Sequence, residues 1–262
     1  MHYKAIFLDI DGTLVSFKTH DIPESTIQAL TTAKEKGLKI FISTGRPPHI
    51  ITNLTKIEHL IDGFVSTNGA YCYIGNRDIC FNTIDKSDVD YIVSRCTELR
   101  KSVIVVTKDN MAVINPGEQF DRLFVDLLNI KNITSDQKTA MQMLSQPIIQ
   151  LTPFIDDATE CDILANTRRC IAGRWHPEFT DITSSSADKG KGLACMAEAL
   201  GINTEETIAF GDGGNDIPII RQAGLGIAMG NACDELKASA KYVTTSIDAD
   251  GIMNALRHFN IA

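Results

Sequence analysis

This 262-residue sequence has almost no tryptophan, and it lacks long apolar runs and an excess of basic residues. It contains one Trp, and its 25 Lys and Arg are outnumbered by 33 Asp and Glu, which gives a formal net charge of −8. Nucleic-acid binders usually carry a basic face, so we expect no nucleic-acid partner. The apolar runs are far shorter than the roughly 20 residues that a transmembrane helix needs, so we expect no membrane association.

Cysteine is present, but not in a pattern that binds zinc or builds a disulfide framework. The seven cysteines are an odd number, and no two of them have CxxC spacing. We therefore expect buried, reduced thiols. In the opening MHYKAIFLDIDG, Asp9 and Asp11 interrupt any long apolar stretch, so a secretory signal is not expected. The predicted location is the cytoplasm, and no protein partner is predicted.

Both ends of the chain alternate short apolar runs, typical of buried strands, with amphipathic helical patterns. The expected strands are residues 4–10, 38–43, 63–67, 207–210, 225–229 and 242–244, with 70–74 as a hairpin arm. The expected helices are residues 22–36, 189–200 and 251–259, and one that opens at Pro47 and Pro48. This alternation favours an α/β fold, a Rossmann-like three-layer core in which helices cover both faces of a parallel sheet.

The middle of the chain follows a different pattern. We expect an amphipathic helix near residues 89–99, a hairpin of 103–106 and 111–114, a helix at 120–128, and strands at 148–155 and 174–183. The last strand is expected to return to the first domain. The predicted domains are therefore a discontinuous α/β core, residues 1–81 and 183–262, and an inserted α+β domain, residues 82–182.

The first candidate site is Asp9-Ile10-Asp11-Gly12-Thr13, directly after a predicted strand. The Asp9 carboxylate suits attack on an electrophile with formation of a covalent intermediate. Asp11 suits protonation of a leaving oxygen and then deprotonation of a water. A calcium loop needs Gly at its sixth position and Glu at its twelfth, where Leu14 and His20 stand. The structural alternative is that the two acids cap the following turn.

The second and third candidate segments carry hydroxyl and cationic groups. Ser43-Thr44-Gly45-Arg46 offers a hydroxyl, an open backbone and a guanidinium, which suit a phosphate. A helix start capped by Thr44 explains this segment equally well. Asp188-Lys189-Gly190-Lys191-Gly192 places lysines at a helix start, against the helix dipole. Pairing with acids and a bound phosphate would explain this placement, and a solvated lysine is the alternative.

The fourth candidate segment is Gly211-Asp212-Gly213-Gly214-Asn215-Asp216, after another predicted strand. Acids separated by glycines crowd negative charge into a tight turn, so a cation is expected there, with a solvated turn as the alternative. All-oxygen ligands with room for phosphate and water favour Mg²⁺ over zinc. The carboxyl ends of parallel strands form one ligand crevice, so the four segments are expected to converge. Mg²⁺ and lysine would then offset the acids and let an anionic substrate approach.

In this order, the segments DIDGT, STGR, DKGKG and GDGGND resemble the four motifs of the haloacid dehalogenase-like (HAD) hydrolase superfamily. The position and size of the insert resemble the Cof-type phosphatases with a C2 (IIB) cap, and the resemblance covers essentially the whole chain. It implies a Mg²⁺-dependent phosphomonoester hydrolase for small phosphorylated metabolites, sugar phosphates foremost. The implied reaction passes through an aspartyl-phosphate.

The resemblance also implies a role for each motif residue. Asp9 is the expected nucleophile, and Asp11 is the expected general acid and base. The expected phosphate-binding residues are Thr44, Gly45, Lys189 and Asn215. The expected metal ligands are Asp9, the backbone carbonyl of Asp11, and Asp212, supported by Asp216.

Asp11 also bears on the class of reaction. Relatives that cleave carbon–halogen bonds lack this second acid, whereas an alkoxide leaving group needs its proton, so Asp11 indicates phosphoester hydrolysis. A phosphosugar mutase is an alternative, because Asp11 would then serve a sugar hydroxyl instead of water. A phosphoryl-switch or binding protein without useful turnover is another. Signalling receiver domains gather similar groups, but their acids are adjacent and they lack an inserted domain.

The insert is expected to select the leaving group, because the core already builds the reaction site. The candidate residues where the insert returns to the core are Arg174, Trp175, His176 and Glu178. An ordinary surface strand with one packed Trp is the alternative for this segment. Arg46 and Asn68 are the candidate substrate contacts from the core.

Overall fold

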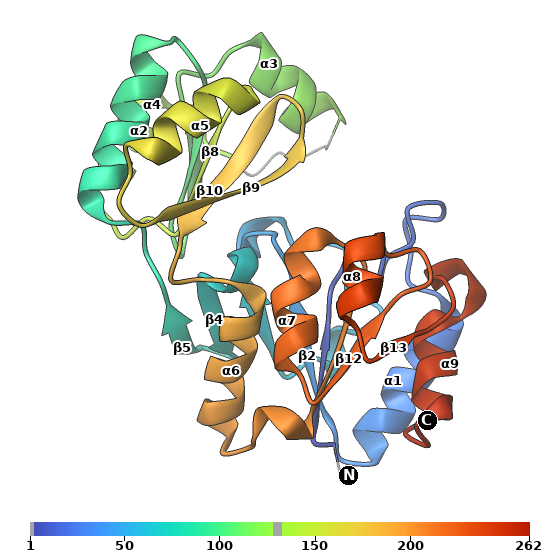
Figure 1. Ribbon diagram of the computed structural model, residues 1–262. Coiled ribbons are helices and arrows are strands. Elements are labelled where there is room, and N and C mark those ends of the chain that lie inside the picture. Colours follow the sequence, from blue (N-terminus) through green and yellow to red (C-terminus); the bar gives the residue numbers. More distant parts are fainter. Residues whose placement is uncertain (1–2, 128–132) are drawn as a thin grey trace. The chain divides into compact units, whose positions relative to one another are not determined.

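The computed structural model describes residues 3–127 and 133–262 and divides into two compact units (Figure 1). The core unit comprises Met1–Arg46, Ile51–Cys80 and Asp188–Ala262. The inserted unit comprises Pro47–Ile50 and Phe81–Ala187, so its long segment begins one residue before and ends five residues after the predicted 82–182. Among the described residues, the helices are too short or too polar to cross a membrane.

The core unit is built on an eight-stranded sheet in the order β13–β12–β11–β1–β2–β3–β4–β5. Its strands are β1 (Ala5–Leu8), β2 (Lys39–Ser43), β3 (Gly63–Ser66), β4 (Tyr71–Ile74), β5 (Arg77–Phe81), β11 (Thr207–Gly211), β12 (Leu225–Ala228) and β13 (Tyr242–Val243). Neighbouring strands from β13 to β3 are parallel, and β4 is antiparallel to β3. The expected parallel-rich α/β core is therefore confirmed.

Helices cover both faces of this sheet, as expected for three layers (Figure 1). In β1, Ile6 and Leu8 pack on one face with α1 and α9, while Ala5 and Phe7 pack on the other with α6, α7 and α8. The helices are α1 (Glu24–Glu35), α6 (Lys189–Leu200), α7 (Ile217–Gln222), α8 (Asp234–Ser239) and α9 (Gly251–His258). Short 3₁₀ turns are η2 (Glu58–Leu60), η3 (Thr67–Gly69), η5 (Thr204–Glu206), η6 (Gly214–Asp216) and η7 (Ile247–Ala249).

The register of the central strands brings three candidate segments to one edge. Leu8 of β1 is level with Phe210 of β11 and with Ile42 of β2. The chain therefore leaves all three strands at the same height, and the polar segments that follow them lie at the carboxyl edge of the sheet.

The inserted unit is built on a five-stranded antiparallel sheet in the order β7–β6–β8–β10–β9. Its strands are β6 (Val103–Val106), β7 (Met111–Ile114), β8 (Gln150–Pro153), β9 (Cys170–His176) and β10 (Phe179–Ser184). Its helices are α2 (Lys86–Glu98), α3 (Glu118–Phe120), a π-helical turn η4 (Asp121–Leu127), α4 (Gln137–Met143) and α5 (Asp157–Ala165), and η1 (Pro48–Ile50) is a 3₁₀ turn. Residues of α2, α4 and α5 pack with one face of the sheet in a single apolar cluster.

Two predicted elements differ in the structure. The single strand expected over 174–183 is a hairpin of β9 and β10, because Pro177 and Glu178 form a turn between them. The helix expected from Pro47 is only the 3₁₀ turn η1. A residue before proline disfavours the helical region, so Pro47 before Pro48 prevents an α-helical start.

Smaller differences concern helix limits and thiols. The helix expected over 120–128 begins at Glu118 and continues as η4 to Leu127, and Leu128 lies outside the described residues. All seven cysteines are free, but only Cys72 and Cys96 are buried, and Cys161 is exposed. The expectation that the thiols are buried was therefore wrong for five of the seven.

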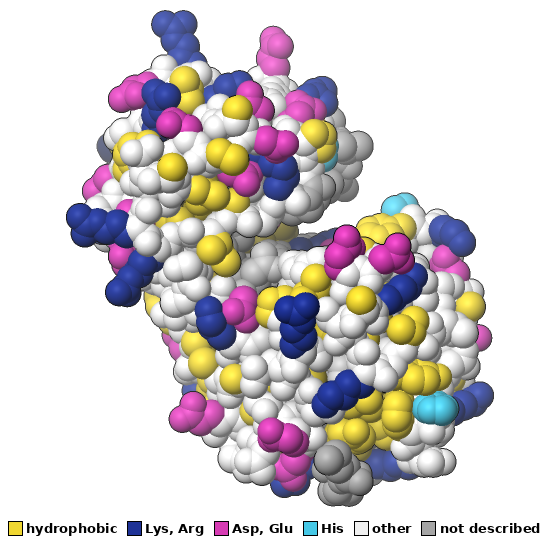
Figure 2. Space-filling model, in the orientation of Figure 1, with side chains coloured by type: hydrophobic (Ala, Val, Ile, Leu, Met, Phe, Trp, Pro, Cys, Tyr) yellow, Lys and Arg dark blue, Asp and Glu magenta, His cyan; other side chains and the backbone are white. Residues whose placement is uncertain are grey.

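Acidic and basic side chains are interspersed on the face drawn in Figure 2. Ion pairs between charged side chains include Lys4 with Glu206 in the core unit and Arg122 with Glu178 in the inserted unit. Interspersed charges of both signs are typical of a solvent-exposed surface.

Candidate active site

A buried lysine lies between two carboxylates at the carboxyl edge of the core sheet. Lys189, the first residue of α6, is fully buried, and its Nζ lies 2.6 Å from Asp9 Oδ1 and 2.5 Å from Asp216 Oδ1. By contrast, Lys191 is half-exposed and pairs with Asp188 at the helix start. Burying a cation is costly unless acids surround it, so this position is built for paired charge.

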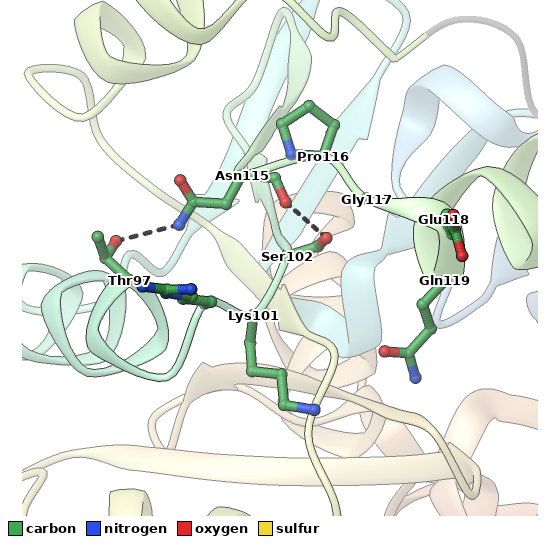
Figure 3. Close-up of a pocket in the computed structure, with 9 residues that line it drawn as sticks. Thr97, Lys101, Ser102, Asn115, Pro116, Gly117, Glu118 and Gln119 are labelled. Carbon is green, nitrogen blue, oxygen red and sulfur yellow. Dashed lines mark hydrogen bonds between the residues drawn. The ribbon is translucent and has the colours of Figure 1, made fainter.

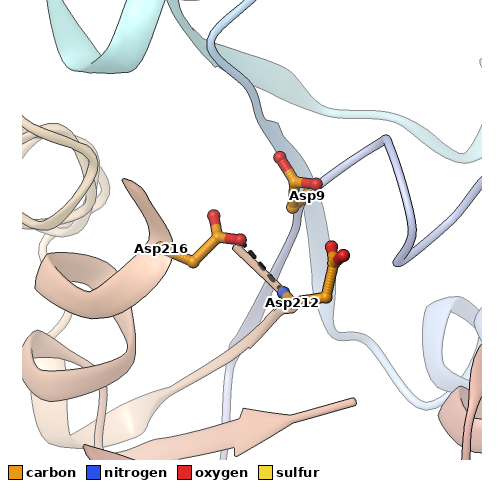
Figure 4. Close-up of side chains that lie close together, drawn as sticks. All are labelled: Asp9, Asp212 and Asp216. Carbon is orange, nitrogen blue, oxygen red and sulfur yellow. Dashed lines mark hydrogen bonds between the residues drawn. The ribbon is translucent and has the colours of Figure 1, made fainter. Parts of the chain in front are cut away.

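Three carboxylates lie close together at this site (Figure 4). Carboxylate oxygens of Asp9, Asp212 and Asp216 all lie within 4.8 Å of one another. Asp9 follows β1, Asp212 follows β11, and Asp216 ends η6 on the same loop as Asp212. The structure thus brings together acids that are about 200 positions apart in the sequence.

The partners of each carboxylate show which oxygens are already used. Asp216 Oδ1 is bound by Lys189, and its Oδ2 accepts hydrogen bonds of 3.0 Å from the backbone N–H groups of Asp212 and Gly213. Asp212 Oδ1 accepts a 2.9 Å hydrogen bond from the Thr13 hydroxyl. Asp216 therefore holds the loop and the lysine, whereas Asp9 and Asp212 each keep one oxygen without a hydrogen bond from a described residue.

Burial and mutual repulsion keep these acids from ionising easily. Burial raises the pKa of the Asp9 carboxyl well above its ordinary value, and the charge of Asp216 adds to this effect while Lys189 opposes it. Burial also raises the pKa of Asp212 to about 6. For Lys189, burial lowers the pKa, but the carboxylates of Asp216 and Asp9 outweigh it and hold the pKa above its ordinary value. A further cation bound by the cluster would therefore stabilise the ionised form of these acids.

The donor set fits Mg²⁺. Among the described residues, no hydrogen bond reaches Asp9 Oδ2, Asp212 Oδ2 or the backbone carbonyl of Asp11. These three free oxygens belong to the residues predicted to bind metal. Hard oxygen ligands in small number, with room left for water and phosphate, are the ligands that Mg²⁺ prefers.

Gly12 allows this close arrangement of loops. Its φ is +83°, a left-handed conformation that glycine adopts without strain. A Cβ at this position would lie 2.2 Å from Asp212 Oδ2. Gly12 and Thr13 thus fix Asp212 from both sides, a role that the sequence analysis did not assign to them.

Asp11 is held by Arg46 in a bidentate ion pair. Arg46 Nε lies 2.9 Å from Asp11 Oδ2, and Arg46 Nη2 lies 2.6 Å from Asp11 Oδ1. This geometry suits an ionised carboxylate. Proton donation by Asp11 therefore requires that its carboxyl leave the ion pair, which makes Arg46 a direct partner of the predicted acid and base.

The remaining core residues predicted to bind phosphate or substrate lie at the same edge. Thr44 is buried, and its carbonyl accepts a 3.0 Å hydrogen bond from the Asn68 N–H. A Cβ on Gly45 would lie 3.2 Å from the Asn68 amide. Asn215 Nδ2 donates to Asn68 Oδ1 over 3.1 Å. Asn68 thus connects the second and fourth motifs.

The turn that carries Asn68 has an unusual backbone. Thr67, Asn68 and Gly69 have φ values of +53°, +50° and +86°. A left-handed β-branched residue such as Thr67 is a genuine outlier. Its hydroxyl is also buried without a hydrogen-bond partner among the described residues. Such strain is maintained at functional sites by the surrounding structure.

Arg174 has partners within the inserted unit. Its guanidinium pairs with Asp157 at 2.7 Å and with Glu160 at 2.7 Å, and it donates to backbone carbonyls that include that of Ile155. These contacts join β9 to α5. A contact between Arg174 and substrate would require some of them to be exchanged.

The neighbours of Arg174 are also engaged. The His176 ring stacks on Phe179 with ring centroids 4.8 Å apart. Glu178 accepts from Gln119 over 2.9 Å and pairs with Arg122. The side chain of Trp175 lies outside the described structure.

A cavity of about 400 Å³ lies in the inserted unit (Figure 3). It is lined by Thr97, Arg100, Lys101, Ser102 and residues 115–119. None of the predicted site residues lines this cavity. We therefore place the candidate active site at the acidic cluster and not at this cavity.

The family model for haloacid dehalogenase-like hydrolases matches residues 6–256. The chain belongs to this family. The putative phosphatase YkrA of Bacillus subtilis is 32% identical over 266 residues, which cover 100% of this chain and 99% of that protein. The 5-amino-6-(5-phospho-D-ribitylamino)uracil phosphatase YcsE of the same organism is 27% identical over 98% of this chain and 95% of its own.

Among solved structures, the HAD subclass IIB sugar phosphatase BT4131 is similar at a TM-score of 0.90. It is 45% identical and covers 99% of this chain and 100% of its own. The predicted membership of the Cof-type HAD phosphatases is confirmed, and the chain is a phosphoric monoester hydrolase.

Proposed function

We propose that this HAD phosphatase uses Mg²⁺ and an aspartyl-phosphate on Asp9 to hydrolyse small phosphorylated metabolites, sugar phosphates foremost. The observation that carries the proposal is the buried ammonium of Lys189 between Asp9 and Asp216, with Asp212 beside them. One lysine and three acids leave a net negative charge, which would repel a phosphate unless a divalent cation is bound.

In the first step, the Asp9 carboxylate attacks the phosphorus atom, and the bond from phosphorus to the leaving oxygen breaks. Asp11 supplies the proton that the leaving oxygen requires. Lys189 holds Asp9 in place and offsets the charge of the transferring group. The products of this step are the alcohol and a phosphoryl group on Asp9.

In the second step, Asp11 is a carboxylate and takes a proton from a water molecule. The water oxygen forms a bond to phosphorus, and the bond between phosphorus and Asp9 breaks. Inorganic phosphate leaves and Asp9 is again a carboxylate. The ion pair with Arg46 suits Asp11 in this second, ionised state.

Other residues bind the phosphoryl group and support the metal. Mg²⁺, held by Asp9, Asp212 and the carbonyl of Asp11, would offset the charge that repels nucleophile and phosphate. Asp216 orients the loop that carries Asp212. The proposed phosphate-binding residues are Thr44, Gly45, Lys189 and Asn215.

The substrate class rests on the relatives and on a small set of side chains. BT4131 is described as a sugar phosphatase, and YcsE by its name acts on a phosphorylated ribityl compound. Polyhydroxylated phosphate esters are therefore the proposed class. The proposed substrate contacts are Arg46 and Asn68 from the core unit and Arg174 and Trp175 from the inserted unit.

Phosphate release from a panel of sugar phosphates, with Mg²⁺ or with a chelator, tests the proposal. We expect metal-dependent release by the natural protein and none by Asp9→Asn, because a neutral amide is not a competent nucleophile. Asp78→Asn is the matched control, since Asp78 is an acid of β5 whose carboxylate accepts a hydrogen bond from the Tyr71 hydroxyl.

Each alternative outcome of this experiment has a clear meaning. Appreciable release by a correctly folded Asp9→Asn protein, checked by circular dichroism, would contradict the assigned nucleophile. Phosphate release that persists in chelator would contradict the proposed dependence on Mg²⁺. An isomerised sugar phosphate in place of free phosphate would identify a mutase, and a long-lived phosphoprotein would identify a switch.

A further inference from the structure

The loop after β12 contacts both of the loops that carry the proposed metal ligands. Asn231 Nδ2 donates a 2.8 Å hydrogen bond to the carbonyl of Gly12. Two residues further on, the Cys233 N–H donates a 3.0 Å hydrogen bond to the carbonyl of Asp212. This loop therefore connects the loop after β1 with the loop after β11, although it contributes no carboxylate to the acidic cluster.

The other end of the Asn231 amide is anchored to a separate element. Its Oδ1 accepts a 3.0 Å hydrogen bond from the Ile247 N–H, the first residue of η7. The Ser16 hydroxyl also donates to Asp248 Oδ1 over 2.6 Å, which joins the loop after β1 to the same turn. Asn231 therefore has a fixed orientation, because both halves of its amide are used.

The Gly12 carbonyl that Asn231 holds belongs to the peptide that leads into Thr13. Thr13 donates to Asp212 Oδ1, and a Cβ at Gly12 would lie 2.2 Å from Asp212 Oδ2. A rotation of this peptide would move both contacts that orient Asp212. The carbonyl of Asp11 belongs to the preceding peptide, which shares the Cα of Gly12 with this one.

Building on the proposed function, we infer that Asn231 is a positioning residue for the Mg²⁺ site. It does not bind the ion. It fixes the Gly12 peptide, and through that peptide it fixes Asp212 and the Asp11 carbonyl. Residues that orient metal ligands in this way typically change metal affinity by about 10- to 100-fold when they are lost.

Asn254 provides a matched control. It is an exposed asparagine like Asn231, and it also bridges two groups at η7, since its Nδ2 donates to Thr245 Oγ1 and to the Ala249 carbonyl, both over 2.9 Å. It touches neither Gly12 nor Asp212. Asn231→Ala and Asn254→Ala thus remove comparable hydrogen bonds, but only Asn231→Ala removes the bond to the Gly12 carbonyl in the loop after β1.

Mg²⁺ binding to the full-length protein, measured by calorimetric titration, tests the inference. We expect Asn231→Ala to bind Mg²⁺ about tenfold more weakly than the natural protein, and Asn254→Ala to bind it normally. The metal-free variants should unfold at similar temperatures, because both side chains are exposed. At saturating Mg²⁺, KM for a sugar phosphate should change by less than about twofold, while the Mg²⁺ concentration needed for half-activity rises in parallel with the binding constant.

Equal Mg²⁺ affinity in the two variants would overturn the inference and leave the proposed function intact. If the natural protein binds no Mg²⁺, the proposed function fails first, so the two failures are distinguishable. If Asn231→Ala fails to fold, Asn231→Ser supplies the same comparison, because it also removes the amide that donates to the Gly12 carbonyl.

Discussion

At the scale of single residues, Lys189 explains why the acids of this site stay close together. Its ammonium is fully buried and is bound by Asp9 and Asp216. Losing one partner of a buried ion pair typically destabilises a protein by about 3–5 kcal/mol. The lysine is therefore part of both the fold and the chemistry, so activity loss in a Lys189 variant is weak evidence for a catalytic role.

The raised pKa of Asp212 predicts how metal affinity depends on pH. Burial raises this pKa to about 6, and Mg²⁺ must displace the proton wherever the carboxyl is protonated. Affinity measured by calorimetric titration should therefore fall as the pH is lowered through about 6. Affinity that rose on acidification would contradict the assignment of Asp212 as a ligand.

The same pKa fixes the sign of a stability effect in the metal-free protein. The ordinary value for Asp212 is 3.8, so the folded state holds a proton in a range where the unfolded chain has lost it. The folded state is therefore favoured at low pH, and this contribution declines as pH rises from about 4 to about 6. Asp9 acts in the same direction, because its pKa is also raised.

Most of the candidate site was predictable at the residue scale, because its residue types are chemically specific. Asp9, Asp212 and Lys189 follow from motifs that stand at strand ends or a helix start. The ion pair between Arg46 and Asp11 was not predictable, since it depends on side-chain geometry. Asn231 was not predictable either, because an asparagine in a turn gives no signal until its partners are known.

At the scale of elements, the start of α6 decides where Lys189 lies. Asp188 is the N-cap of this helix, and its carboxylate accepts a 2.8 Å hydrogen bond from the Lys191 N–H. The cap fixes the first helical turn, of which Lys189 is the first residue. The position of Lys189 is therefore tied to a local capping interaction.

Removing this cap should lower stability and activity together. We expect Asp188→Ala to lower the free energy of unfolding by about 1 kcal/mol and to reduce kcat, whereas Asp188→Ser should retain both because its hydroxyl also caps. Thermal unfolding and phosphate release measure the two effects. A stability loss in Asp188→Ala without any change in kcat would show that the cap does not position Lys189.

Elements with a strong pattern were predicted well, and those without one were missed. α6 occupies the predicted residues 189–200 because its apolar stripe is clear. α5 was missed because only Ile163 is buried among its residues, so no stripe forms. Its N-cap Asp156, which accepts from the Thr159 N–H, was the available signal.

At the scale of the whole molecule, the fold places four distant segments at one sheet edge. Leu8, Ile42 and Phe210 are level in neighbouring parallel strands, so the polar residues after them meet. This arrangement was predictable from the alternation of strands and helices. The end of the insert was harder to predict, because β10 of the inserted sheet extends to Ser184, beyond the predicted limit at residue 182.

The central claim is that a phosphoryl group is carried by Asp9, and trapping it in an Asp11→Asn protein is the most direct test. This variant lacks the acid and base, so 4-nitrophenyl phosphate, whose leaving group needs no proton, should phosphorylate it faster than water can hydrolyse it. After an acid quench, mass spectrometry should find one added phosphoryl group, located on Asp9. A phosphoryl group on another residue, or nitrophenol release with no phosphoprotein and undiminished turnover, would contradict the account.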